Sequence, residues 1–174
     1  MHKLRLATAP AIALALAMVA AAPAAAAQPT RTVYDLSGGL HHAGEGCAFD
    51  IRFVDAPGAR MTITDFADGR EAVDDHAVAT LTNLANGKTF VHKAFFHDVS
   101  TYDPSTNEYT GTTNGQVINW FSPGDVSPFG GIVGGSGMAV RFVGTVSYTW
   151  DDTAGRLTAF SYVGTATDVC ALLS

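Results

Sequence analysis

The chain has 174 residues with a formal net charge of −6, and 47% of its residues are hydrophobic. An acidic chain is a poor partner for nucleic acid, whose phosphates are bound by Lys and Arg. The ten Phe, five Tyr and two Trp residues supply enough large apolar side chains for a core, which excludes an intrinsically disordered protein.

Residues 1–27 have the pattern of a secretory signal peptide. A positively charged start precedes an apolar stretch rich in Ala and Leu, and three small residues at 25–27 come before an expected cut ahead of Gln28. The stretch is too short and too rich in alanine for a membrane anchor. We therefore expect a secreted, extracellular protein that has no membrane attachment after cleavage.

The first predicted elements follow a flexible, glycine-containing lead-in over 28–46, and a single domain is expected over 47–174. The segment 48–54 alternates apolar and polar residues, which is the period of a strand because successive side chains point to opposite faces. A second strand is predicted over 61–66, and the tight-turn dipeptide Asp68-Gly69 follows it.

Residues 70–84 fit both a helix and a strand. Apolar side chains recur at helical spacing up to Leu84, whereas three β-branched residues alternate as in a strand: Val78, Thr80 and Thr82. The β-branched content and the hairpin dipeptide Asn86-Gly87 favour the strand. The next strand, over 88–99, places four residues on one apolar face: Phe90, His92, Ala94 and Phe96.

Two further strands are predicted over 109–113 and 116–121. The segment 122–138, rich in Gly and Pro, interrupts the pattern and predicts a long irregular loop. Alternation returns over 139–150, and the last strand, over 156–167, leads to Cys170.

About eight strands with short connections and no predicted helix indicate an all-β domain. An up-and-down antiparallel barrel and a two-sheet β-sandwich both fit this pattern. The predominance of local hairpins favours the barrel. Closure of a barrel also leaves no strand edge unpaired. The two cysteines, Cys47 and Cys170, are expected to form one disulfide in an oxidising compartment and to close the seam between the first and last strands.

Four segments carry a family resemblance: 47–49 (CAF), 82–88 (TNLANGK), 120–125 (WFSPGD) and 164–173 (GTATDVCALL). In these segments the chain resembles a group of uncharacterised small exported proteins from high-GC Gram-positive bacteria. The resemblance implies export, a β-rich domain and a paired cysteine. It implies no activity and no catalytic residue.

No motif in the chain indicates catalysis, a metal or a cofactor. His41, His42 and Glu45 contain metal-ligating groups, but adjacent residues rarely converge on one ion. The serine residues lack the surroundings of a nucleophile, and the carboxylates are spread over turns. We therefore predict no catalytic residue, no metal and no cofactor.

His92 is the one polar residue on its apolar face. It is either a core histidine with a hydrogen-bond partner or, beside a cavity, a group that contacts a ligand or acts as a base. The aromatic residues of the other strands either pack in the core or line a pocket, and the sequence leaves both alternatives open. The candidate ligand-lining residues are His92, Phe96, Trp120 and Tyr148.

The functional hypothesis is an exported barrel that binds a small apolar ligand without catalysis, since barrels of about eight strands can hold one such ligand. Two alternatives stay open. One is a cell-envelope or extracellular interaction module that acts through the loop 122–138. The other is an isomerase- or hydrolase-type enzyme in the barrel mouth that uses His92. The sequence specifies neither the ligand nor the oligomeric state.

Overall fold

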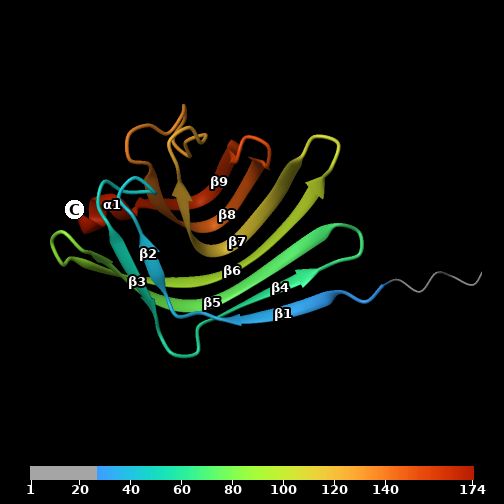
Figure 1. Cartoon of the computed structure of the whole chain (residues 1–174), viewed down its shortest axis with the longest axis horizontal. Helices are drawn as coiled ribbons and strands as arrows, with labels where there is room; N and C mark the ends of the chain where they lie inside the picture. Colours follow the sequence, from blue (N-terminus) through green and yellow to red (C-terminus); the bar gives the residue numbers. More distant parts are fainter. Residues whose placement is uncertain (1–26) are drawn as a thin grey trace, which may run out of the picture.

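The computed structural model describes residues 27–174, so the predicted signal peptide lies outside the described residues except for Ala27 (Figure 1). The described part is all-β, as expected, and contains one short helix that was not predicted. Its elements are β1 (Thr30–Asp35), β2 (Gly39–His41), β3 (Ile51–Asp55), β4 (Arg60–Asp65), β5 (Arg70–Asn83), β6 (Thr89–Asp103), β7 (Glu108–Phe121), β8 (Met138–Asp151), β9 (Arg156–Asp168) and α1 (Val169–Leu173).

The strands form one antiparallel sheet in the order β1-β4-β5-β6-β7-β8-β9. The two halves of β5 have different partners on the same side, because β3 pairs with 79–83 and β4 pairs with 71–76. β2 extends the branch beyond β3. The ambiguous segment 70–84 is therefore a strand, as its β-branched residues indicated.

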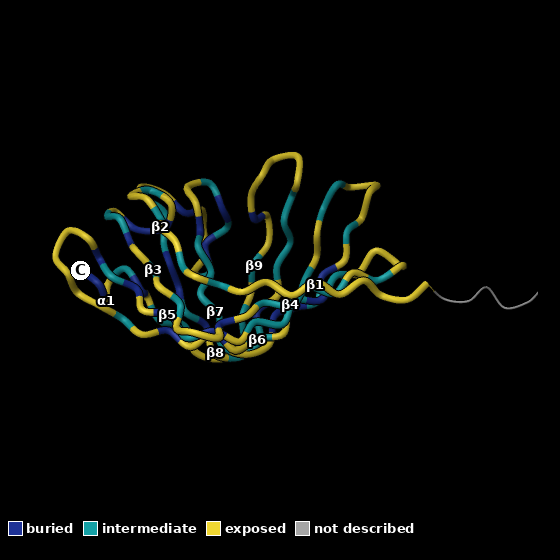
Figure 2. Tube along the Cα trace, turned by 60° about the horizontal axis from the view of Figure 1, so that its bottom comes forward, coloured by how far each residue is buried: buried dark blue, intermediate teal, exposed yellow. Residues whose placement is uncertain are grey.

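The sheet curves into an open trough, and the expected closed barrel is not formed among the described strands (Figure 1, Figure 2). Closure would require the two ends of the sheet, β1 and β9, to pair. Instead, β1 extends the sheet beyond β4, and the chain after β9 turns into α1. Among the described residues, β9 therefore pairs only with β8 and is an edge strand.

A row of three glycines crosses the sheet where it bends. Gly115, Gly144 and Gly164 lie in register on β7, β8 and β9, and their φ values are +127°, +138° and +134°. A Cβ at each position would lie 2.1–2.2 Å from a backbone carbonyl oxygen of the neighbouring strand. Only glycine fits such a close approach, and kinks of this kind give a sheet its curvature.

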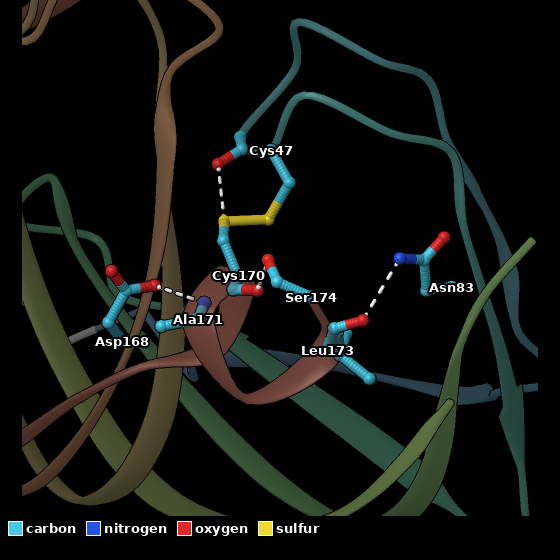
Figure 3. The surroundings of a disulfide bond; sticks show 8 residues. Cys47, Asn83, Asp168, Cys170, Ala171, Leu173 and Ser174 are labelled. Carbon is cyan, nitrogen blue, oxygen red and sulfur yellow. Dashed lines mark hydrogen bonds between the residues drawn. A yellow bond between two sulfur atoms is a disulfide. The ribbon is translucent and has the colours of Figure 1, made fainter. Parts of the chain in front are cut away.

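The disulfide joins α1 to the loop before β3, and the predicted Cys47–Cys170 pairing is confirmed (Figure 3). The helix contacts β6 and β8 and buries Val169 and Leu173. Its N-cap is Asp168, whose carboxylate accepts a hydrogen bond from the backbone N–H of Ala171. Five helical residues are too few to produce a periodic signal in the sequence, so this helix was not predicted.

Residues 28–46, expected to form a flexible lead-in, contain β1 and β2. All six residues of β1 are exposed, because this strand lies at the edge of the sheet and covers no core. Neither strand shows the alternation of a half-buried strand, which explains why the sequence pattern did not indicate them. Among the described residues, no helix is long and apolar enough to cross a membrane.

The loop 122–137 is irregular, as predicted, but it is anchored on the sheet. Asp125 is 3% exposed, and its two carboxylate oxygens accept hydrogen bonds from the backbone N–H groups of Ser122 and Leu157. Val133 is buried against the core, whereas Phe129 and Ile132 are exposed.

Candidate functional site

A cavity of about 490 Å³ opens on the inner face of the sheet, which is the face that carries Ala77, Ala94 and Phe96. β5 and β6 form its floor. The segment around β1 and β2 and strand β3 form one side, and the end of β7 forms the other. Cavities of this size are typical of sites for small ligands.

The floor of the cavity is made of small side chains. Ala77 lies opposite Ala94 in the β5–β6 register, and Ala79 lies opposite His92. All three alanines are buried. Methyl groups at three neighbouring positions leave space above the sheet that larger side chains would fill, so the cavity results directly from this register.

Aromatic rings form the walls. The ring of His41 stacks on Trp120 with centroids 3.8 Å apart, and Phe53 lies on its other side at 5.3 Å. Gly46 allows the backbone to approach this group, because a Cβ there would lie 2.5 Å from the Trp120 ring. Phe96 lines the cavity next to the alanine floor.

His92 is the buried polar residue at one end of the floor. Its side chain is 5% exposed, and its Nδ1 atom has no hydrogen-bond partner within residues 27–174. Burial, and secondly the positive charge of Arg141, lower the pKa of His92 to about 4. The imidazole is therefore neutral at neutral pH and offers one donor and one acceptor.

Asp75 lies on β5 four residues before Ala79, the residue opposite His92, which is about 13 Å along the strand direction. Its Oδ1 atom is buried and also has no partner in the described part of the chain. Burial, and secondly the negative charge of Asp55, raise the pKa of Asp75 to about 6. Asp35 also lines the cavity, as does Asp55, which ends β3 opposite Ala79, and burial also raises the pKa of Asp55.

The structure brings together three of the four predicted lining residues. His92, Phe96 and Trp120 line the cavity. Tyr148 lies elsewhere: its hydroxyl donates a hydrogen bond to Asp98 (3.0 Å), and its ring lines a second hollow of about 350 Å³. Alternation correctly placed Tyr148 on the inner face, but it does not tell where along the curved sheet a residue lies.

Sequence reasoning missed Asp75, Asp55, His41 and Phe53. Asp75 was obscured because residues 70–84 also fit a helix; strict alternation would have placed it on the face of Ala77, Ala79 and Leu81. His41 lies in the segment taken for a loose lead-in. Phe53 was predicted to lie in a strand, but its position beside the cavity was not predicted.

The other histidines form no site. His97 on β6 contacts Asp74 on the neighbouring strand β5, with 2.8 Å between Nδ1 and Oδ1. This pair was not predicted from the sequence. Both side chains are about half exposed, and neither lines the cavity. His42 and Glu45 are exposed, whereas His41 stacks on Trp120. No three His, Cys, Asp or Glu side chains of residues 27–174 are placed to hold a metal ion.

Comparison with protein-family models, with curated proteins and with solved structures gave no match. The resemblance to small exported proteins of high-GC Gram-positive bacteria therefore stays a prediction.

The lining of the cavity combines apolar surface with few polar groups. The cavity offers a methyl floor, aromatic walls, a neutral imidazole and carboxylates. Ser37 is the only hydroxyl that lines it, and no hydrogen bond joins Ser37 to His92 in the described structure. A nucleophile with its base requires such contact, so nucleophilic chemistry has no support here.

Proposed function

We propose that this protein is an exported binding protein that holds one small, largely apolar ligand in the cavity above β5 and β6. The observation that carries the proposal is the cavity itself: about 490 Å³, lined mainly by alanine, aliphatic and aromatic side chains together with a few polar groups. The disulfide supports an oxidising, non-cytoplasmic location.

The unpartnered polar atoms add support. A buried donor or acceptor without a partner costs about 1–3 kcal/mol. His92 Nδ1 and Asp75 Oδ1 both carry such a cost, and both residues line the same cavity. A bound ligand with a polar group at either end would remove it, while its apolar body would cover the alanine floor and the Trp120 ring.

The test is binding of an apolar fluorescent probe such as N-phenylnaphthylamine to the mature protein, with and without obstruction of the cavity. Ala79→Leu adds bulk inside the cavity. Thr80→Leu adds bulk at the next residue, which is exposed on the opposite face, and is the matched control. We expect binding of one probe per chain that weakens at least about tenfold in Ala79→Leu only. Equal binding by all three proteins would refute the proposal.

A second assay identifies what the cavity holds. The native protein is extracted with organic solvent and the extract is analysed by mass spectrometry. The proposal predicts a compound that is recovered from the wild type and from Thr80→Leu and is depleted from Ala79→Leu. The two other functions suggested by the sequence have less structural support, because the loop 122–137 is anchored by Asp125 and His92 has no catalytic partner.

A further inference from the structure

The charges in the cavity are all of one sign. Three carboxylates line it, those of Asp35, Asp55 and Asp75, and no Lys or Arg side chain does. Asp35 is in contact with Arg60, 3.9 Å away, but both side chains are largely exposed at the rim. Asp55 and Asp75 belong to no ion pair in the structure of residues 27–174.

The two sides of the cavity differ in electrostatic character. On the side formed by β1, the end of β3 and β5, Asp75 has a buried oxygen without a partner and lies within the electrostatic influence of Asp55, which ends β3 opposite Ala79. On the β6 side, the buried His92 is neutral, and Arg141 is not among the lining residues. A negative charge is thus available to a ligand on the β1–β3–β5 side only.

A carboxylate in such a place is stabilised by one kind of ligand group. A cation would supply the missing partner of Asp75 and reduce its repulsion from Asp55, through charge-assisted hydrogen bonds that are stronger than neutral ones. A neutral polar group would supply only a hydrogen bond. An anion, such as a fatty acid carboxylate, would be repelled by all three aspartates.

We propose that the ligand is a cationic amphiphile: one ammonium group seated at Asp75, with Asp55 beside it, on an apolar body that lies over the alanine floor toward Trp120. This inference rests on the proposed function, because it gives the chemical class of the ligand held in the same cavity. His92, on the β6 side, is available for one neutral hydrogen bond to that body.

The test compares three probes that share one apolar chain and differ in the head group: n-octylamine, n-octanol and octanoate. Titrations are made at neutral pH and read by the fluorescence of Trp120, in a Trp150→Phe background that leaves Trp120 as the only tryptophan. We expect the amine to bind at least about tenfold more tightly than the alcohol, a difference of about 1.4 kcal/mol. Octanoate should bind most weakly.

Asp75→Asn tests whether the carboxylate is responsible. This variant should reduce the affinity for the amine to that for the alcohol and leave the affinity for the alcohol unchanged within about twofold. Asp74→Asn removes a carboxylate from the neighbouring residue, which contacts His97 outside the cavity, and should change neither affinity. Asp55→Asn provides a second variant within the site, with a smaller loss for the amine.

The outcomes separate this inference from the proposed function. If the amine and the alcohol bind equally, or if octanoate binds best, the cationic ligand is refuted while the apolar binding cavity stands. If the amine preference survives in both Asp75→Asn and Asp55→Asn, the assignment of the cation to this side is refuted. If none of the three probes binds and the apolar fluorescent probe does not bind either, both proposals fail.

Discussion

The inner face of this sheet has two regions built in opposite ways. On β7, β8 and β9 it is filled by large side chains: Phe121 and Phe142 are fully buried, and the ring of Phe160 lies 4.9 and 5.3 Å from theirs. On β5 and β6 the corresponding positions are alanines, and a cavity of about 490 Å³ takes the place of the rings.

Two carboxylates of this face differ in the partners that the chain gives them. Asp98, next to the packed region, accepts hydrogen bonds from Thr113 (2.5 Å) and Tyr148 (3.0 Å). Asp75 and His92, beside the cavity, each have a buried atom without a partner. Buried atoms without a partner also occur on β7 and β8, at Asn119 Oδ1 and Arg141 Nε, but Asp75 and His92 both line the cavity of about 490 Å³, where a ligand can supply the partner.

The disulfide gives the largest expected effect. Replacing both Cys47 and Cys170 by Ser should lower the free energy of unfolding by about 4–5 kcal/mol, because the bond closes a loop of more than a hundred residues. Urea denaturation of the oxidised wild type and the double variant measures this. A loss below about 1 kcal/mol would contradict a stabilising role for the bond in joining α1 to the loop before β3.

The packed region should be far more sensitive to truncation than the open one. Phe142→Ala should destabilise the protein by about 3–5 kcal/mol, since it leaves a cavity among rings that cannot collapse. Phe96→Ala, at the edge of an existing cavity, should cost less than half as much. Urea denaturation of the two variants provides the comparison, and equal losses would show that the open region is packed as tightly as the other.

A comparison of Gly144, in the glycine row, with Gly155, outside it, separates the cost of a positive φ from the cost of a steric clash. Gly144→Ala should cost about 2–4 kcal/mol, because its methyl group would lie 2.1 Å from the carbonyl oxygen of Val163. Gly155 also has a positive φ (+61°) but nothing within 4 Å of its added Cβ, so Gly155→Ala should cost only about 1 kcal/mol. Thermal unfolding of both variants measures the difference, and a reversed order would contradict the proposed close approach.

The pH dependence of stability should separate His92 from Asp75. His92 titrates at about 4 when folded and at its ordinary value of 6.5 when unfolded, so its contribution to stability is lost as the pH falls from 6.5 to 4. Asp75 has the opposite sign: its folded pKa of about 6 lies above the ordinary 3.8, so acidification over that range adds stability. Asp55 and His76 influence Asp75, and Arg141 influences His92.

Two variants resolve these opposing effects. On acidification from neutral pH to pH ~4.5, Asp75→Asn should lose more stability than the wild type, by about 1 kcal/mol after allowance for its partial exposure. His92→Gln should lose less than the wild type, by about 2 kcal/mol. Urea denaturation at both pH values measures this. The reverse order would mean that the cavity does not desolvate these groups.

Local patterns predicted the disulfide and most of the strands, because alternation and the pairing of two lone cysteines depend on few residues. They missed β1 and β2 and divided β7 into two strands at Gly115, where the sheet is kinked but the strand continues. The inward direction of His92 was predicted for the same reason. Closure of the sheet was not predictable, since it depends on whether β1 and β9, the two ends of the sheet, come within pairing distance. Asp75 and Tyr148 show the other limit: a face follows from alternation, but the position along a curved sheet follows from register and from the glycine row.

Native mass spectrometry of the protein, purified gently from the cells that produce it, tests the binding cavity most directly. We predict that the wild type and Thr80→Leu carry one small molecule per chain, and that Ala79→Leu has the mass of the polypeptide alone. A bare polypeptide mass for all three, together with a gain in stability for Ala79→Leu, would show instead that the open region is only a void in the packing.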